Sequence, residues 1–315
     1  NTEPADSEPP ALTQIAGRVL DPEGNAIPNA QVAICTKQIH VIVNDGNLEP
    51  SKVSDSEETE IVQTNSQGNF EFKMSPPEHF SLIAAHDSGC AVIASEDFIH
   101  SQVIHLEQWG RIEGQLAPGR GATENKIWLA MLPNSTWLRD RYEYRYETLS
   151  DTDGAFTFDR VPPGWVEVGY LTSTGRGSAS VTSRTPVEVK SGQTTNIKLA
   201  DEGRPITGRF VPPEDYNKPI DFHDGLRDLS TKHPPEPLPD NYDEMTAPEQ
   251  KQWRDKWYQS DEYKARMEDW WHDPDHRQYC FAINDDGSFR IEDVIAGTYD
   301  LRIWIEDRRQ GNYTE

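Results

Sequence analysis

The chain has 315 residues, an apolar fraction of 35% and a formal net charge of −24. This length allows two or three domains, and the low apolar content favours small domains with thin cores. The excess of acidic groups repels phosphate backbones and anionic lipid, so we expect no nucleic-acid partner. Apolar runs are all too short to span a bilayer, and we expect no membrane insertion.

The N-terminal segment, residues 1–13 (NTEPADSEPPALT), is acidic, proline-rich and without hydrophobic periodicity. Such a composition is typical of a disordered tether. Because the first residue is Asn rather than Met, we expect that a preceding segment, such as a signal peptide, has been removed. This interpretation predicts an extracytoplasmic location: secreted, periplasmic or at the cell surface.

An internal repeat dominates the sequence. A polar pair, a glycine and alternating apolar and polar residues recur as SQGNFEF (66–72), TDGAFTF (152–158) and DDGSFRI (285–291). Glycine suits the positive φ of a tight turn, and the alternation places every second side chain on the core face of a strand. Each copy therefore predicts a turn that enters a half-buried strand.

Two further elements accompany each motif. A short strand with a central glycine precedes it, at Gly17, Gly114 and Gly208. A proline- or glycine-containing turn and another strand follow it, at 161–168 and 294–303, with a looser copy at 74–82. The same order three times, at a period of about 100 residues, predicts three tandem β-sandwich domains. Their expected bounds are 14–107, 108–200 and 201–315.

The first repeat carries a family resemblance. Its segment 17–32 (GRVLDPEGNAIPNAQV), followed by the motif at 66–72, resembles the carboxypeptidase regulatory-like domain. The resemblance implies a transthyretin-like, seven-stranded Greek-key sandwich that is grouped with carbohydrate-binding-like folds. It also implies a non-enzymatic appendage of a secreted or periplasmic bacterial protein. It covers 15–106 well and 111–199 moderately, because the second copy lacks the DxxGxxIP stretch.

The third repeat, with its insertion, is similar to repeats in planctomycete multi-domain surface or periplasmic proteins. In some of those proteins a thioredoxin-like domain follows such repeats. No thioredoxin pattern lies within this chain, which reaches Glu315 soon after the strand-like run 299–305. We therefore expect the protein to continue beyond this point.

The insertion occupies 211–278 of the third repeat. Residues 211–240 are proline-rich and irregular, and we expect them to wrap the surface. The segment Thr246-Ala-Pro-Glu249 is a capping box with Pro in the first turn, which predicts a helix from about 247 to 271. A break is expected at Ser260-Asp261, and Pro274 should stop the helix.

The predicted helix is rich in aromatic residues, which form the candidate ligand platform: Trp253, Trp257, Tyr258, Tyr263, Trp270 and Trp271. The favoured interpretation is that their face packs onto a sheet or covers a sheet edge. The alternative is an exposed platform for a glycan or a protein partner.

A second aromatic group contains Trp137 and the run Tyr142, Tyr144 and Tyr146. The three tyrosines alternate, so one strand should present them on a single face. That face could be open to a ligand or form the edge of a core.

No motif predicts an enzyme, and no catalytic, cofactor-binding or metal-binding residue is assigned. The segment 272–276 (HDPDH) holds two imidazoles and two carboxylates, but a metal site needs further ligands with fixed geometry. The cysteines, Cys35, Cys90 and Cys280, lack zinc-site spacing. A Cys35–Cys90 bridge and buried free thiols both remain open.

Together these features predict a non-catalytic extracytoplasmic structural or interaction module. A rigid array of sandwiches would present the aromatic insertion or a further C-terminal domain to a protein or polysaccharide partner. The alternative function is a carbohydrate-binding protein that uses exposed Trp and Tyr. The sequence does not predict the oligomeric state.

Overall fold

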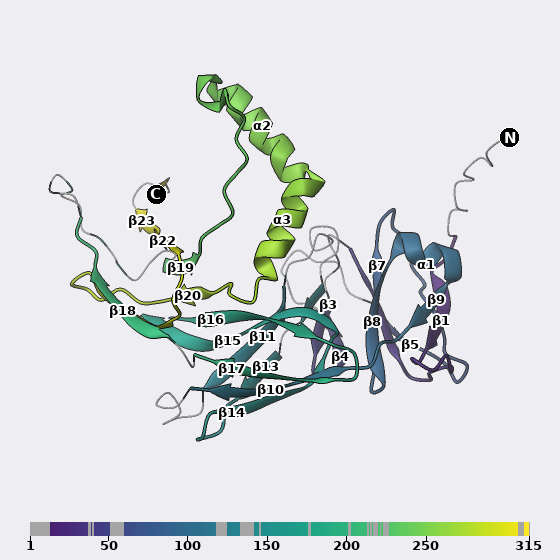
Figure 1. Ribbon diagram of the computed structural model, residues 1–315. Coiled ribbons are helices and arrows are strands. Elements are labelled where there is room, and N and C mark those ends of the chain that lie inside the picture. Colours follow the sequence, from purple (N-terminus) through teal and green to yellow (C-terminus); the bar gives the residue numbers. More distant parts are fainter. Residues whose placement is uncertain are drawn as a thin grey trace.

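The computed structural model is mainly β, and it confirms the predicted fold class. Sheets that face one another carry the cores, and a helical arm projects from them (Figure 1). The structure describes residues 13–36, 39, 41–50, 60–117, 125–132, 142–144, 146–175, 178–200, 203–212, 214, 216, 220, 222, 227–307 and 312–314.

The first repeat is a sandwich of a three-stranded and a four-stranded sheet, with an added hairpin and one short helix. Its elements are β1 (Ala16–Leu20), β2 (Gln31–Cys35), β3 (Val41–Asn44), β4 (Asn47–Pro50), β5 (Ile61–Gln63), β6 (Asn69–Glu71), β7 (Ser81–His86), β8 (Gly89–Ala94), α1 (Ser95–Ser101) and β9 (Val103–His105). The sheet orders are β6-β1-β9 and β5-β2-β7-β8.

The second repeat has the same arrangement. Its strands are β10 (Gly110–Leu116), β11 (Lys126–Met131), β12 (Tyr142–Tyr144), β13 (Tyr146–Leu149), β14 (Ala155–Val161), β15 (Gly164–Gly175), β16 (Ser178–Val189) and β17 (Thr194–Leu199). Here β14-β10-β17 matches β6-β1-β9, and β13-β11-β15-β16 matches β5-β2-β7-β8.

The third repeat carries the two longer helices. Its elements are β18 (Arg204–Arg209), β19 (Arg227–Thr231), η1 (Tyr242–Glu244), α2 (Ala247–Gln259), α3 (Asp261–Trp271), β20 (Gln278–Cys280), β21 (Ser288–Val294), β22 (Tyr299–Ile303), β23 (Ile305–Asp307) and β24 (Asn312–Thr314). The pair β18-β21 matches β1-β6, and the order β20-β19-β22 matches β5-β2-β7.

The repeated motif explains the repeated glycines. The motif glycines have φ values of 77°, 88° and 83°, as expected for the turn. The glycine of each opening strand lies opposite the first motif phenylalanine. A Cβ at Gly114 or Gly208 would collide with that ring, whereas a Cβ at Gly17 would collide with the Gln102 carbonyl oxygen and the Phe98 ring. At Gly114 and Gly208, only glycine therefore lets the ring lie across the neighbouring strand. The register pairs are Gly17↔Phe70, Gly114↔Phe156 and Gly208↔Phe289.

The first two repeats share one core. On β7, the neighbouring residues Leu82 and Ile83 are both fully buried, but they face opposite sides. Leu82 packs into the core of the first repeat, whereas Ile83 joins a cluster that continues into the second repeat. In addition, β12 of the second repeat pairs in parallel with β3 of the first repeat. The two repeats therefore form one body.

The tyrosine run from 142 to 146 differs from its prediction as a single strand. It is divided between β12, which pairs with β3, and β13, which pairs with β11. Tyr146 is buried, and its hydroxyl accepts a hydrogen bond from the Gly46 amide at 3.1 Å. This tyrosine therefore connects the two repeats. Trp137 lies outside the described residues.

The second and third repeats meet along a sheet edge. Strand β20 pairs antiparallel with β16 at Arg184↔Gln278, which extends the sheet to β13-β11-β15-β16-β20-β19-β22. The third repeat has its own small core, which includes Leu229, Tyr279 and Phe281. We refer to the joined sheets of the three repeats as the sandwich body.

All three cysteines are buried and none forms a disulfide, so the Cys35–Cys90 bridge is absent and the thiol alternative holds. Burial raises the pKa of the Cys90 thiol well above its ordinary value. Within the described part of the chain, no helix combines the length and apolarity that a membrane span requires.

Candidate functional site

The predicted long helix consists of α2 and α3, which we call the arm. The break lies at Ser260, whose extended backbone (φ −72°, ψ 150°) ends α2. Its Oγ accepts a hydrogen bond from the Tyr263 amide at 3.1 Å and so caps α3. At the other end, the Thr246 amide donates to Glu249 Oε2 at 2.8 Å, which forms the predicted capping box.

The arm stands away from the sheets, in contrast to the favoured expectation that its aromatic face packs onto one (Figure 1). Neither helix, each described in full, contains a buried residue. Instead, residues 232–245 run back along the arm, and we call this segment the strap. The strap supplies contacts that a sheet would otherwise provide.

Polar groups from both helices of the arm bind the strap. Gln250 and Tyr258 belong to α2, and Arg266 and Trp270 belong to α3. The donors and acceptors are Gln250 Nε2 to Tyr242 O (3.0 Å), Tyr258 OH to Glu236 Oε1 (2.7 Å), Arg266 Nη2 to Pro235 O (2.8 Å) and Trp270 Nε1 to Lys232 O (3.1 Å).

The aromatic residues of the middle arm contact one another. Trp253 and Trp257 are stacked, with ring centroids 6.1 Å apart and planes inclined by 14°. Tyr263 meets Trp257 edge-on at 5.8 Å, and Tyr242 of the strap meets Trp253 edge-on at 5.5 Å. The tryptophans are half-buried, and Tyr258 is 44% exposed. This cluster is neither a closed core nor a fully open platform.

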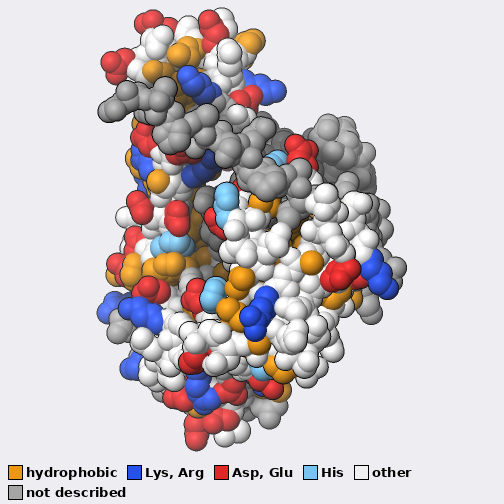
Figure 2. Space-filling view, turned by 90° about the vertical axis from the view of Figure 1, so that its right-hand side faces the viewer, with side chains coloured by type: hydrophobic (Ala, Val, Ile, Leu, Met, Phe, Trp, Pro, Cys, Tyr) orange, Lys and Arg blue, Asp and Glu red, His pale blue; other side chains and the backbone are white. Residues whose placement is uncertain are grey.

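Charged groups border these rings. The guanidinium of Arg254 lies 5.7 Å from the Tyr242 ring, and that of Arg266 lies 5.9 Å from the Trp257 ring. Both contacts are cation–π interactions. The hydrogen bond to Glu236 raises the pKa of Tyr258, because ionisation would place two negative charges together. Figure 2 shows apolar side chains between acidic and basic ones at the tip of the arm, at the top of the view.

The base of the arm has a separate aromatic cluster. Trp270 and Trp271 meet the ring of His276 at 4.3 and 5.0 Å, both edge-on. His276 is 2% exposed, and neither of its ring nitrogens has a hydrogen-bond partner among the described residues. Burial lowers the pKa of His276 to about 4, so the ring is neutral near pH 7.

His272 fixes the base to the second repeat. Its ring stacks on Trp165 of β15, with centroids 4.7 Å apart and planes 10° from parallel. On the same strand, Glu167 is buried and pairs with Arg184 Nη1 at 3.1 Å. Burial raises the pKa of Glu167, and the guanidinium opposes that shift. Among the described residues, this stacking attaches the base of the arm to the sheet.

The structure divides the six platform candidates into two groups. Trp253, Trp257, Tyr258 and Tyr263 lie together in the middle of the arm, while Trp270 and Trp271 belong to the base. In the HDPDH segment, the two imidazoles have separate aromatic partners. Within the described residues, no group of three or more His, Cys, Asp and Glu side chains is arranged to hold a metal ion.

Two sets of contacts were not predicted from the sequence: those between the strap and the helices, and the stacking of His272 on Trp165 at the base of the arm. Nothing in the proline-rich composition of 232–240 indicates that Glu236 will meet Tyr258. Trp165 lies at the start of β15 in the second repeat, and only the fold brings it to His272. The buried Tyr242 lies four residues before the N-cap Thr246, outside the position of the hydrophobic staple, so that rule does not predict its contact with the helix.

Comparisons with known proteins do not assign this chain to a family. No protein-family model matches the chain, and no curated protein matches it in sequence. A crystal structure of a proposed carbohydrate-binding protein from Pseudomonas aeruginosa is 17% identical, with a TM-score of 0.19, over 30% of this chain and 88% of that one. The minor pilin of Streptococcus agalactiae is 10% identical, with a TM-score of 0.29, over 58% of this chain and 94% of that one.

A streptococcal ancillary pilin is also similar, at 11% identity and a TM-score of 0.26, over 59% of this chain and 62% of that one. All three TM-scores lie below 0.5. The similarity therefore extends over parts of the structures, and it assigns no function to this chain.

Proposed function

We propose that this protein is a non-catalytic, extracytoplasmic spacer whose sandwich body holds the arm at a fixed position for contact with a protein partner. Within this proposal, the repeats are of the carboxypeptidase regulatory-like type. The observation that carries it is the joining of the repeats: a shared core links the first and second, and a continuous sheet links the second and third.

Rigid connection is what a spacer requires. Domains joined only by flexible linkers move independently, whereas a large apolar interface suppresses such motion. Here the shared cluster contains Val43 and Ile83 from the first repeat and Ile127 and Val168 from the second, all fully buried. Separating these repeats would expose this apolar surface to water.

Distance measurement between two spin labels tests rigidity. Val92 of β8 and Leu301 of β22 are 39% and 49% exposed, so V92C and L301C accept labels while the native cysteines stay buried. A single narrow distance distribution is expected. A control pair within the first repeat, V92C with Q67C, gives the width of a rigid reference. A distribution several times wider than this reference would contradict the spacer.

Carbohydrate binding is the second candidate. The nearly parallel rings of Trp253 and Trp257 and the exposed ring of Tyr258 favour it, because flat aromatic surfaces pack against sugar rings. Acrylamide quenching of tryptophan fluorescence, repeated with a panel of polysaccharides, tests it. Protection by one polysaccharide that W253A and W257A abolish would support a glycan platform. Unchanged quenching with every polysaccharide would remove this candidate and leave the spacer.

A further inference from the structure

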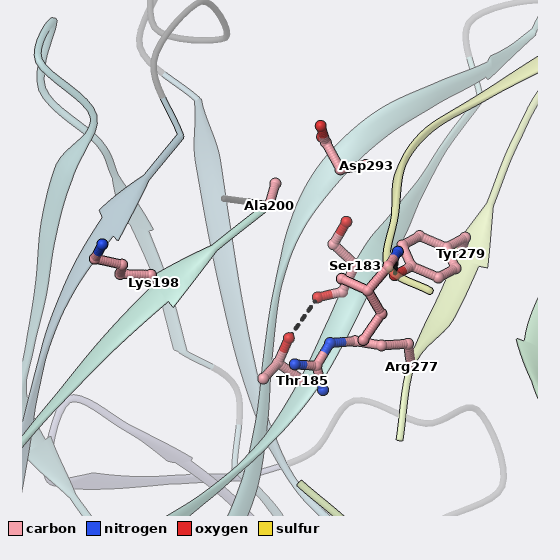
Figure 3. Close-up of a pocket in the computed structure, with 8 residues that line it drawn as sticks. Ser183, Thr185, Lys198, Ala200, Arg277, Tyr279 and Asp293 are labelled. Atoms are coloured by element: carbon pink, nitrogen blue, oxygen red, sulfur yellow. Dashed lines mark hydrogen bonds between the residues drawn. The ribbon is translucent and has the colours of Figure 1, made fainter. Parts of the chain in front are cut away.

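A pocket lies at the junction of the second and third repeats, and neither proposed function uses it. Its volume is about 250 Å³. The second repeat contributes Ser183 and Thr185 of β16 and Lys198 of β17, and the third repeat contributes Arg277, Tyr279 and Asp293 (Figure 3).

The backbone around this pocket is unusual. Six described residues other than glycine have positive φ, and three of them line this pocket: Ser183 (51°), Ala200 (60°) and Asp293 (56°). The left-handed region is unfavourable for residues with a Cβ, and such strain collects at functional sites. Ser183 and Asp293 also lie where the strand pairing shifts register, and such bulges redirect side chains.

The Ser183 hydroxyl is a second and independent observation. Ser183 is 3% exposed, and its Oγ has no hydrogen-bond partner among the described residues. Its backbone oxygen accepts a bond from Thr185 Oγ1 at 3.0 Å, which fixes the residue. Figure 3 shows the free end of the Ser183 side chain directed along the wall, toward the Asp293 side of the pocket. Buried hydroxyls are normally paired, so this oxygen favours a ligand with a complementary polar group.

The charges of the lining define the class of ligand. The lining holds two cationic side chains, Lys198 and Arg277, and one carboxylate, Asp293. Arg277 Nη1 donates to Pro274 O at 2.6 Å and to His276 O at 2.7 Å, so the guanidinium is held in place. Hydroxyl groups and a carboxylate of the lining suit ligand hydroxyls, and the cations suit a ligand carboxylate.

We infer that this pocket binds a small hydroxylated carboxylate, of the size and chemistry of one uronic acid residue. The volume is below that of pockets for drug-sized ligands, which start at about 300 Å³. A bound ligand would contact both repeats at once, and its binding energy would stabilise their junction. The inference is independent of the proposed function, because the pocket is formed by the sandwich body and Arg277 rather than by the arm.

Titration calorimetry of the whole protein with sodium glucuronate tests the inference. We expect saturable binding with one site, and we expect glucose or acetate alone to bind at least tenfold more weakly. K198Q removes a lining cation and should weaken glucuronate binding at least tenfold. K190Q removes an exposed lysine of the connection between β16 and β17, outside the pocket, and should leave the affinity within twofold.

S183G tests the role of the Ser183 hydroxyl without lowering the stability of the fold. Glycine tolerates the positive φ, so the melting temperature should stay the same or rise, while loss of the hydroxyl weakens glucuronate binding. W257A, which alters only the arm, should leave glucuronate binding unchanged. Absence of glucuronate binding to the native protein, or equal effects of K198Q and K190Q, would overturn the inference.

One further titration distinguishes the two sources of a uronate. If a trigalacturonate binds at least as tightly as galacturonate, the pocket takes the end of an acidic polysaccharide. If the trimer is excluded while the monomer binds, the pocket takes a free sugar acid. Both results support the inferred ligand class.

Discussion

The sandwich body and the arm use aromatic residues in opposite ways. In the body, rings such as Phe72 and Tyr279 are fully buried between sheets. In the arm, six aromatic residues lie on two helices that contain no buried residue. Apolar burial therefore stabilises the body, whereas mutual ring contacts and the strap stabilise the arm. Regions with few buried contacts open locally at low free energy, so the arm should unfold before the body.

The largest expected effect concerns the shared core. Ile83→Ala should lower the free energy of unfolding by about 2–5 kcal/mol, because it leaves a cavity between two repeats. Hydrogen exchange should then accelerate in β15 of the second repeat as well as in β7. Leu82→Ala is the matched control: the loss of stability should be similar, with acceleration concentrated in the first repeat. Equal exchange patterns for the two variants would show that the repeats are not coupled through this core.

The second effect concerns the base of the arm and depends on pH. His276 has a pKa of about 4 in the folded protein and about 6.5 when unfolded, so the unfolded chain binds more protons between these values. Stability from the neutral ring is complete above pH 6.5 and is lost as the pH falls toward 4, up to about 3 kcal/mol.

His276→Phe should remove that pH dependence. The measurement is denaturant unfolding of both proteins from pH 8 to pH 4.5, compared as a difference so that the carboxylates common to both cancel. The exposed His100→Gln serves as a control and should follow the native protein. A native profile parallel to that of H276F would show that the base does not exclude the protonated ring.

An effect of intermediate size concerns the close packing of a phenylalanine ring of the body against a glycine, a contact that the arm lacks. Gly114→Ala places a methyl group against the Phe156 ring and should cost about 1–3 kcal/mol, as overpacking does. Adding Phe156→Leu should recover part of the lost stability. The measurement is thermal unfolding of both single variants and of the double variant. Purely additive effects would mean that the glycine is not required by the ring.

The smallest effect concerns the tip of the arm. Thr246→Ala removes the N-cap side chain and should reduce the stability of α2 by about 1 kcal/mol. Amide exchange in the first turns of α2 should accelerate about fivefold, while global unfolding stays unchanged. A matching loss of global stability would mean that the arm and the body unfold together.

Local patterns predicted much of this fold. Turn glycines, strand alternation and the capping box each depend on neighbouring residues, and all are present in the structure. The shared core could have been predicted from two strands. The sequences of β2 and β7, QVAIC and SLIAAH, are nearly continuous apolar runs, which indicate burial on both faces of a sheet. The strap and the stacking of His272 on Trp165 depend on contacts distant in sequence, which no local pattern encodes.

The parallel pairing of β12 with β3 has a consequence for how this protein can change over evolutionary time. A gene duplication or deletion that adds or removes one whole repeat would leave an unpaired strand edge and half of a core without its other half. We therefore expect these repeats to be gained or lost only as a set. Variation in length should be tolerated in connections that face solvent, as in the insertion that forms the strap and the arm.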